Sequence, residues 1–252
     1  NRAGQAKQKL GMQKIVFLII GFLAVVLCHA QGTAHDQLIQ TAKYESGEVV
    51  PYILTEVNLQ KPKYALILMP GGNGNISPYM QDGRLVFQLA GNFLIRSRDL
   101  FADPETIVIS TDSTGSPERV KAILADLNVR YQNLDIYIIG TSKGTYSTMQ
   151  LGLRMDGQVK GFVHTASMSS ISGYDTREFK SRHLLVHHIN DGCSLTGYSG
   201  AKANHDKYKT TLISVDGGDS YGDPCLAQAY HGFKNIESSV VSQIKAWIKQ
   251  SH

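Results

Sequence analysis

Gly140-Thr141-Ser142-Lys143-Gly144 stands between an apolar run at 134–139 and a stretch with helical spacing at 143–155. The pattern G-x-S-x-G is typical of a sharp strand-to-helix turn, in which the two glycines relieve crowding and the serine hydroxyl is lifted above the sheet. The five residues alone would also fit an ordinary tight turn. Between a strand and a helix they predict that Ser142 is a nucleophile.

Strands and helices are predicted to alternate on both sides of this turn. Each predicted strand is nearly continuous in apolar residues, which is typical of a mostly parallel central sheet with helices on both faces. No repeat or low-complexity linker interrupts residues 31–252, which predicts a single α/β domain. The other predicted strands are 49–54, 64–69, 106–110, 159–164, 183–189 and 211–215, and the other helices are 85–100, 117–131 and 236–248.

Two residues that could activate a serine follow later strands of the sheet. A serine hydroxyl needs a general base, and the base needs a carboxylate to orient it. Asp191 comes directly after the strand 183–189, and His231 comes after the last strand. A turn aspartate before Gly192 and a turn histidine remain the alternative interpretations. Other candidates for the acid are Asp175, Asp206, Asp216, Asp219 and Asp223.

The turn around Ser142 and the chain order Ser, Asp, His resemble the α/β-hydrolase family, over nearly all of residues 36–250. This resemblance implies an α/β-hydrolase fold with Ser142 as nucleophile and His231 as the general base that later protonates the leaving group. Asp191 would orient the imidazole. The resemblance implies no cofactor and no metal.

An acyl-transfer site also needs donors for the oxyanion that develops in the transition state. One is expected to be the backbone N–H of Lys143, the residue after the nucleophile. The other is expected from the loop 71–74 after the strand 64–69, where by similarity to the family's His-Gly-x pattern Gly72 is the first candidate and Asn73 the second. Pro70 stands where the family has histidine, so the donor stays open, and a plain glycine-rich turn is the alternative.

The formal net charge of +4 comes from the first thirty residues. Without them the chain carries 21 basic and 21 acidic residues, so a nucleic-acid partner is not indicated. The fractions of hydrophobic residues, 42%, and charged residues, 18%, exclude a disordered or collagen-like chain. The net positive charge is therefore a property of the N-terminal segment, and the predicted domain is formally neutral.

Residues 1–30 are predicted to be a signal peptide. The apolar run 15–27 follows a basic flank and is shorter than the roughly 20 residues that a membrane-spanning helix needs. Cleavage after Ala30 would give a secreted or periplasmic protein without a membrane attachment, whereas a lipoprotein anchored through Cys28 is the alternative. Met12 is an alternative start, which would make residues 1–11 upstream read-through.

Two cysteines, Cys193 and Cys225, would remain after cleavage, and in an oxidising compartment they are predicted to form a disulfide. Cys193 lies two residues after Asp191 and Cys225 six residues before His231, so the bridge would tie the acid loop to the histidine loop. Two unpaired thiols are the alternative.

The segment 167–181 is too short for a folded cap, so no sizeable cap domain is expected and the pocket should be open. The predicted rim residues are Ser167, Met168, Ser169, Ile171 and Tyr174.

Three other motifs are assigned no function. Strand alternation sends His187 and His188 to opposite faces, which argues against a metal site with His183 and Asp191. The S-x-x-K pattern at 199–202 lacks the companion motifs of penicillin-recognising enzymes. The charged stretch 96–99 is interpreted as a solvated or ion-paired helix end rather than an anion site.

These patterns predict a secreted or periplasmic serine hydrolase that cleaves a small-molecule ester through an acyl-enzyme. One alternative is a peptidase or another acyl hydrolase on the same site, and another is a catalytically silent fold that binds a ligand or a protein. The sequence does not predict an oligomeric state.

Overall fold

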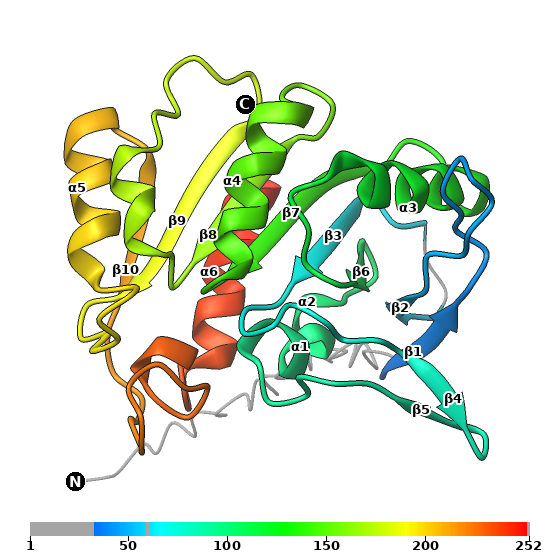
Figure 1. Cartoon of the computed structure of the whole chain (residues 1–252), viewed down its shortest axis with the longest axis horizontal. Coiled ribbons are helices and arrows are strands. Elements are labelled where there is room, and N and C mark those ends of the chain that lie inside the picture. The colour runs from blue at the N-terminus through cyan, green and yellow to red at the C-terminus, as the bar shows by residue number, and fades with distance from the viewer. Residues whose placement is uncertain (1–32, 59–60, 251–252) are drawn as a thin grey trace, which may run out of the picture. The chain divides into compact units, whose positions relative to one another are not determined.

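A mostly parallel eight-stranded sheet carries the fold in the computed structural model, which describes residues 33–58 and 61–250 (Figure 1). Strands β6, β3, β7, β8, β9 and β10 pair in parallel, whereas β2 is antiparallel to both of its neighbours. The order is β1 (Ala34–Ile39), β2 (Tyr52–Val57), β6 (Thr106–Ser110), β3 (Tyr64–Met69), β7 (Asp135–Thr141), β8 (Gly161–Thr165), β9 (Arg182–His188) and β10 (Thr211–Val215).

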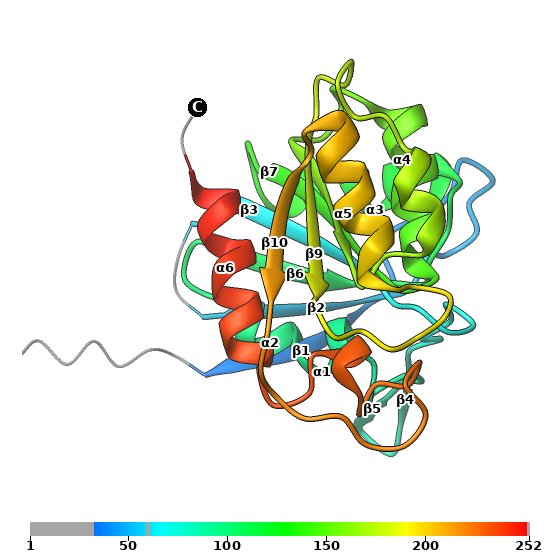
Figure 2. The same cartoon turned by 90° about the vertical axis from the view of Figure 1, so that its left-hand side faces the viewer.

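Helices cover both faces of this sheet (Figure 2). One face carries α3 (Pro117–Arg130), α4 (Gly144–Met155) and α5 (Tyr198–Tyr208), and the other carries α1 (Phe93–Arg96), α2 (Arg98–Phe101) and α6 (Glu237–Lys249). The 3₁₀ turns are η1 (Ser169–Gly173) and η2 (Tyr230–Gly232), and a small hairpin consists of β4 (Tyr79–Gln81) and β5 (Arg84–Val86).

Alternation along the central strands explains the two cores. In β3, Leu66 and Leu68 pack on the face of α1, α2 and α6, whereas Ala65, Ile67 and Met69 pack on the face of α3 and α4. Successive side chains of a strand point to opposite faces, so a strand buried on both sides has to be apolar throughout. The observed sheet therefore confirms the predicted fold class.

Several predicted elements differ from the structure. The expected helix over 85–100 is wrong, because β5 and an irregular loop precede two short helices, α1 and α2, that meet at Ser97. The strand expected at 49–54 begins at Tyr52, since Pro51 has no backbone N–H to donate. The sequence analysis also missed β1 and α5. The signal peptide predicted for residues 1–30, its alternative anchor Cys28 and the start at Met12 lie outside the described residues.

Candidate active site

Ser142 lies on the turn between β7 and α4, at the carboxyl edge of the parallel strands. Its φ of +53° is in the left-handed region, which a residue other than glycine rarely adopts. The turn is held by its backbone, since the Ser142 N–H donates to the carbonyl of Thr165 at 3.1 Å and its carbonyl accepts from Thr145. A Cβ on Gly144 would lie 2.5 Å from the carbonyl oxygen of Met69, so only glycine lets α4 start this close to β3.

The glycine loop after β3 packs directly on this serine. A Cβ on Gly71 would lie 2.7 Å from the Cβ of Ser142, so a side chain at Gly71 would displace the serine. Gly72 also reaches the cavity beside Ser142, whereas the Asn73 side chain accepts from the Asn75 N–H at 3.1 Å and turns back into its own loop. Within the described residues, the backbone N–H groups of Gly71, Gly72 and Lys143 donate to no other protein atom.

A cavity of about 170 Å³ opens beside Ser142 and also contains His231 in its wall. Its lining is mainly apolar and combines the glycine loop, the loop before α1 and the loop before η2. The apolar side chains of its wall include Leu89, Phe93, Leu226 and Ala227. The nucleophile and base predicted from the sequence thus face one small cavity. No hydrogen bond between described residues joins the Ser142 hydroxyl to the His231 ring.

Asp191 and His231 are in direct contact. Nδ1 of His231 lies 3.0 Å from Oδ2 of Asp191, and the Asp191 side chain is fully buried. Burial alone would raise the pKa of Asp191, but the hydrogen bonds from His187 and His231 hold it well below its usual range. The carboxylate is therefore charged at neutral pH and fixes the tautomer in which His231 carries a proton on Nδ1.

Two further residues on this carboxylate were missed by the sequence analysis. The Thr196 hydroxyl donates to Oδ2 of Asp191 at 3.1 Å and lies 3.0 Å from Nδ1 of His231. Nε2 of His187 lies 3.2 Å from the same Oδ2. A usable signal existed only for His187, which precedes Asp191 by four residues at the end of a strand.

Comparison with protein-family models and with the sequences of curated proteins found no match. Comparison with solved structures found proteins whose fold is similar over most of this chain. An alpha-beta serine hydrolase homologue from Coxiella burnetii has a TM-score of 0.57 at 15% identity, over 83% of this chain and 97% of that one. A serine hydrolase without lid from Xanthomonas campestris also has a TM-score of 0.57, at 9% identity over 86% and 97%. The esterase domain of a Rhodothermus marinus protein has a TM-score of 0.52, at 14% identity over 84% and 97%.

The chain has the α/β-hydrolase fold. Its sheet order, its strand directions and the turn that carries Ser142 all agree with this assignment. As predicted, the fold has no sizeable cap domain, because only η1 and an irregular segment separate β8 from β9. The rim expected from this segment is wrong, since Ile171 and Tyr174 are buried in a cluster with α4 and α5 and no rim residue lines the cavity.

A disulfide joins Cys193 and Cys225, as predicted, with their Cα atoms 4.6 Å apart. The backbone N–H of Cys193 donates to Oδ1 of Asp191 at 3.0 Å, and Cys225 contributes to the wall of the cavity. In this α/β-hydrolase fold, the bridge therefore connects the loop of Asp191 with the loop that leads to His231.

The other aspartates considered for the acid have different partners. Asp175 pairs with Arg177, and Asp206 pairs with Lys202 on the exposed face of α5, which also accounts for the S-x-x-K pattern. The other three accept hydrogen bonds from nearby groups: Asp216 from the Asn190 amide, Asp219 from the Asn235 amide and Asp223 from the N–H of Cys225. Asp191 alone among these six contacts His231 in the described residues.

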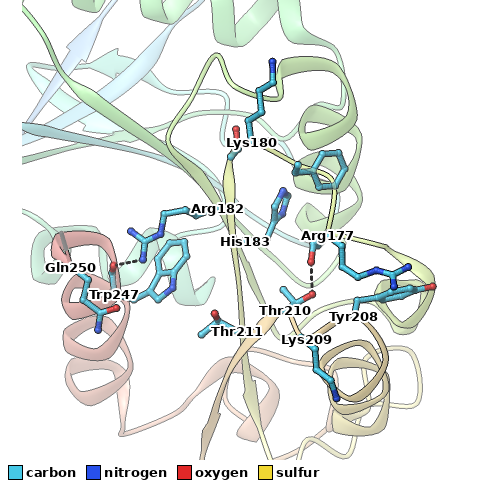
Figure 3. Close-up of a pocket in the computed structure, with 13 residues that line it drawn as sticks. Arg177, Lys180, Arg182, His183, Tyr208, Lys209, Thr210, Thr211, Trp247 and Gln250 are labelled. Carbon is cyan, nitrogen blue, oxygen red and sulfur yellow. Dashed lines mark hydrogen bonds between the residues drawn. The ribbon is translucent and has the colours of Figure 1, made fainter. Parts of the chain in front are cut away.

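A larger hollow of about 390 Å³ lies at the opposite edge of the sheet, where β9 and β10 begin (Figure 3). Three of the cations that line it, Arg177, Arg182 and Lys209, already have partners. Arg182 donates to the carbonyl of Trp247 near the end of α6 and stacks on that indole, and Lys209 donates to the carbonyl of Asp206 near the end of α5. Cations favourably complete the C-terminal ends of helices, so these residues have a structural explanation.

The described ranges contain neither a cluster of metal ligands nor a membrane-spanning helix. No group of three or more His, Cys, Asp or Glu residues there could hold a metal ion. The His188 ring donates to the carbonyl of Gly217 and accepts from the N–H of Asn190. The adjacent His187 contacts Asp191 instead, so the two histidines have different partners. No helix in residues 33–58 and 61–250 is both long and apolar enough to cross a membrane.

Proposed function

We propose that this protein is a secreted or periplasmic serine hydrolase that cleaves small carboxylic esters through an acyl-enzyme. Ser142 is the nucleophile, His231 the general base and Asp191 the orienting acid. The observation that carries the proposal is that Ser142 and His231 face one small cavity, while the other nitrogen of His231 contacts a buried carboxylate.

The first half of the reaction forms the acyl-enzyme. His231 Nε2 takes the proton of Ser142 as its oxygen attacks the ester carbonyl, which requires these atoms to come into hydrogen-bond contact once substrate is bound. The carbonyl π electrons move to oxygen and form a tetrahedral oxyanion. The intermediate then collapses, the alcohol leaves, and the imidazolium returns the proton to it. Asp191 stabilises the transient positive charge on His231.

The second half returns the enzyme to its starting state. A water molecule gives a proton to His231 as its oxygen attacks the acyl carbon. The second intermediate then collapses and releases the acid, while the imidazolium returns the proton to the oxygen of Ser142. The oxyanion of both steps would accept from the N–H of Lys143 and from the glycine loop. Gly72 is favoured over Asn73 as the second donor, since Gly72 lines the cavity and its N–H has no protein partner.

A small acyl group fits the size and lining of the cavity. Its volume of about 170 Å³ is below the roughly 300–1,000 Å³ of pockets for drug-sized ligands. The wall is mainly apolar, and none of the residues that line it is an aspartate, glutamate, lysine or arginine. Secretion is supported by the disulfide, because such bonds persist in oxidising compartments.

Labelling with a fluorophosphonate probe and hydrolysis of short aryl esters test this proposal. Wild type should be labelled and active, and Ser142→Ala should be neither. Ser238→Ala, a serine exposed on α6, is the matched control and should behave as wild type. A folded wild-type protein without labelling or activity would favour the silent binding fold instead. Faster cleavage of matched amides than of esters would favour a peptidase.

A further inference from the structure

Oδ2 of Asp191 is contacted by more groups than a Ser-His-Asp site requires. His231, Thr196 and His187 all place a nitrogen or oxygen within 3.2 Å of this one atom. The other oxygen, Oδ1, accepts from the N–H of Cys193 at 3.0 Å. The proposed acid is therefore fixed at both oxygens, and one donor is a second imidazole.

His187 is placed to hold the carboxylate but not to act as the base. Its side chain is fully buried, and it is not part of the wall of the cavity that contains Ser142. The next residue, His188, cannot share this position, because successive side chains of a strand point to opposite faces. The His188 ring faces the other side of β9 and bonds to Gly217. His187 can thus reach the reaction only through Asp191.

The hydrogen bond to Asp191 fixes a proton on one nitrogen of the His187 ring. A carboxylate can only accept here, so Nε2 of His187 is the donor. Nδ1 is buried and has no partner among the described residues. A buried nitrogen without a partner destabilises the fold. An apolar side chain would avoid this cost, so the packing of β9 alone does not account for a histidine at this position.

His187 is also the donor that comes from the sheet. Cys193 and Thr196 belong to the loop after β9, and His231 belongs to the turn η2. Loops open locally more readily than central strands, and precise sites depend on support from rigid elements. The hydrogen bond from His187 on β9 to Oδ2 therefore anchors the carboxylate to the sheet, even when the loop that carries Asp191 opens locally.

We propose that His187 is a positioning residue, which holds Asp191 in the orientation that His231 needs. The proposal rests on the proposed function, because it assigns His187 a role in the same Ser142, His231 and Asp191 site. It predicts a specific kinetic signature. Loss of the donor should slow the chemical steps and leave substrate binding in the cavity nearly unchanged.

Two variants separate the donor from the packing of the ring. His187→Phe keeps a flat ring but removes the donor, and kcat should fall about 10- to 100-fold, as for small misplacements of catalytic groups, with KM within about 2-fold. His187→Gln can place an amide N–H near the position of Nε2 and should recover most of the lost kcat. His183→Phe is the matched control, since His183 is a buried histidine of the same strand, about 13 Å away. Its kcat should equal that of wild type.

The imidazole N–H signal of His231 in a ¹H–¹⁵N spectrum gives a readout that does not depend on activity. This signal should shift in His187→Phe and return towards the wild-type position in His187→Gln. If wild type is inactive, the proposed function fails, while the spectrum still reports whether His187 orients the pair of Asp191 and His231.

Three results would overturn the role of His187. Unchanged kcat in a folded His187→Phe protein would do so, as would equal losses in His187→Phe and His187→Gln. An unchanged His231 signal in both variants would also do so. Should His187→Phe not fold, His187→Asn replaces it, because its shorter amide does not reach the position of Nε2. It should then lose kcat relative to His187→Gln, and equal kcat values would refute the proposal.

Discussion

The backbone N–H of Cys193 donates to Oδ1 of Asp191, and the sulfur of the same residue is bonded to Cys225. Cys225 in turn lies in the wall of the cavity that contains Ser142 and His231. A covalent connection therefore runs from the residue that fixes the proposed acid to the wall of the proposed substrate pocket. This connection makes the geometry of the site sensitive to the state of one disulfide.

Removal of this disulfide should lower both stability and activity. The closed loop spans 32 residues, for which the chain-entropy estimate is about 3–4 kcal/mol of unfolding free energy. Cys193→Ala/Cys225→Ala should lose an amount of this order in urea denaturation. It should also lower kcat, because the loop that carries the Cys193 N–H is less restrained. Wild-type kcat in the double variant at a temperature where it is folded would contradict the supporting role.

The cavity should discriminate among acyl chains. Leu89 lies over the glycine loop, with its Cδ2 3.6 Å from the position of a Cβ on Gly72. Wild type should hydrolyse esters of short acyl groups, from acetyl up to butyryl, with a higher kcat/KM than octanoyl esters. Leu89→Ala should extend the preference by one or two methylenes, each worth about 0.8 kcal/mol or roughly 4-fold. Leu153→Ala, at a leucine 65% exposed on α4, should leave the chain-length profile unchanged.

Arg96 should control the position of the histidine turn. Its guanidinium donates to the carbonyls of Gly232 at 2.6 Å and Gly91 at 2.7 Å, and pairs with Glu237 at 2.8 Å. These contacts join the residue after His231 to the loop before α1, and the ion pair of Arg96 agrees with one of the two interpretations of the charged stretch 96–99. Arg96→Met should lower the free energy of unfolding by about 1–3 kcal/mol.

A matched arginine separates the local effect of Arg96 from general loss of stability. Arg98 pairs with Asp36 and donates to the carbonyl of Ile95, away from the cavity. Arg96→Met should lower kcat on aryl esters, whereas Arg98→Met should lower stability only. Equal kcat in the two variants would show that Arg96 has no part in placing His231.

Local patterns in the sequence predicted the fold, and they pointed to a serine, an aspartate and a histidine that the structure brings close together. The turn at Ser142 could be predicted because its glycines, its strand and its helix are adjacent in the chain. The contact of Asp191 with His231 agrees with the predicted order of residues, but their catalytic roles stay a prediction. Thr196 could not be predicted, because its contact with both residues depends on how the loop after β9 folds back.

The elements that were not predicted, α5 and β1, lack a regular pattern of apolar residues. In α5 the buried positions include Gly200, Ala201 and Asn204, and the Asn204 amide donates to the carbonyls of Ile171 and Tyr174. A helix that buries small and polar groups gives no hydrophobic stripe to detect. Edge strand β1 is largely polar and only its last residue, Ile39, is buried, so it also lacks an apolar run.

Stability in acid should depend on two buried histidines that do not line the cavity. Nε2 of His164 and Nδ1 of His183 lie 3.1 Å apart, and the Thr148 hydroxyl lies 2.8 Å from the other nitrogen of His164. Burial lowers the pKa of His164 well below its ordinary value of 6.5 and that of His183 to about 4. Both rings are therefore neutral in the folded protein at pH 5–7.

The unfolded chain takes up protons on these rings below about pH 6.5, whereas the folded protein does not, so the free energy of unfolding should fall as pH drops from 6.5 towards 4. Each histidine contributes at most about 1.4 kcal/mol per pH unit. His183→Asn retains an amide near Nδ1 and cannot titrate, so its slope in urea denaturation between pH 6.5 and 5 should be about half that of wild type. A wild-type slope in His183→Asn would mean that other groups cause the acid sensitivity.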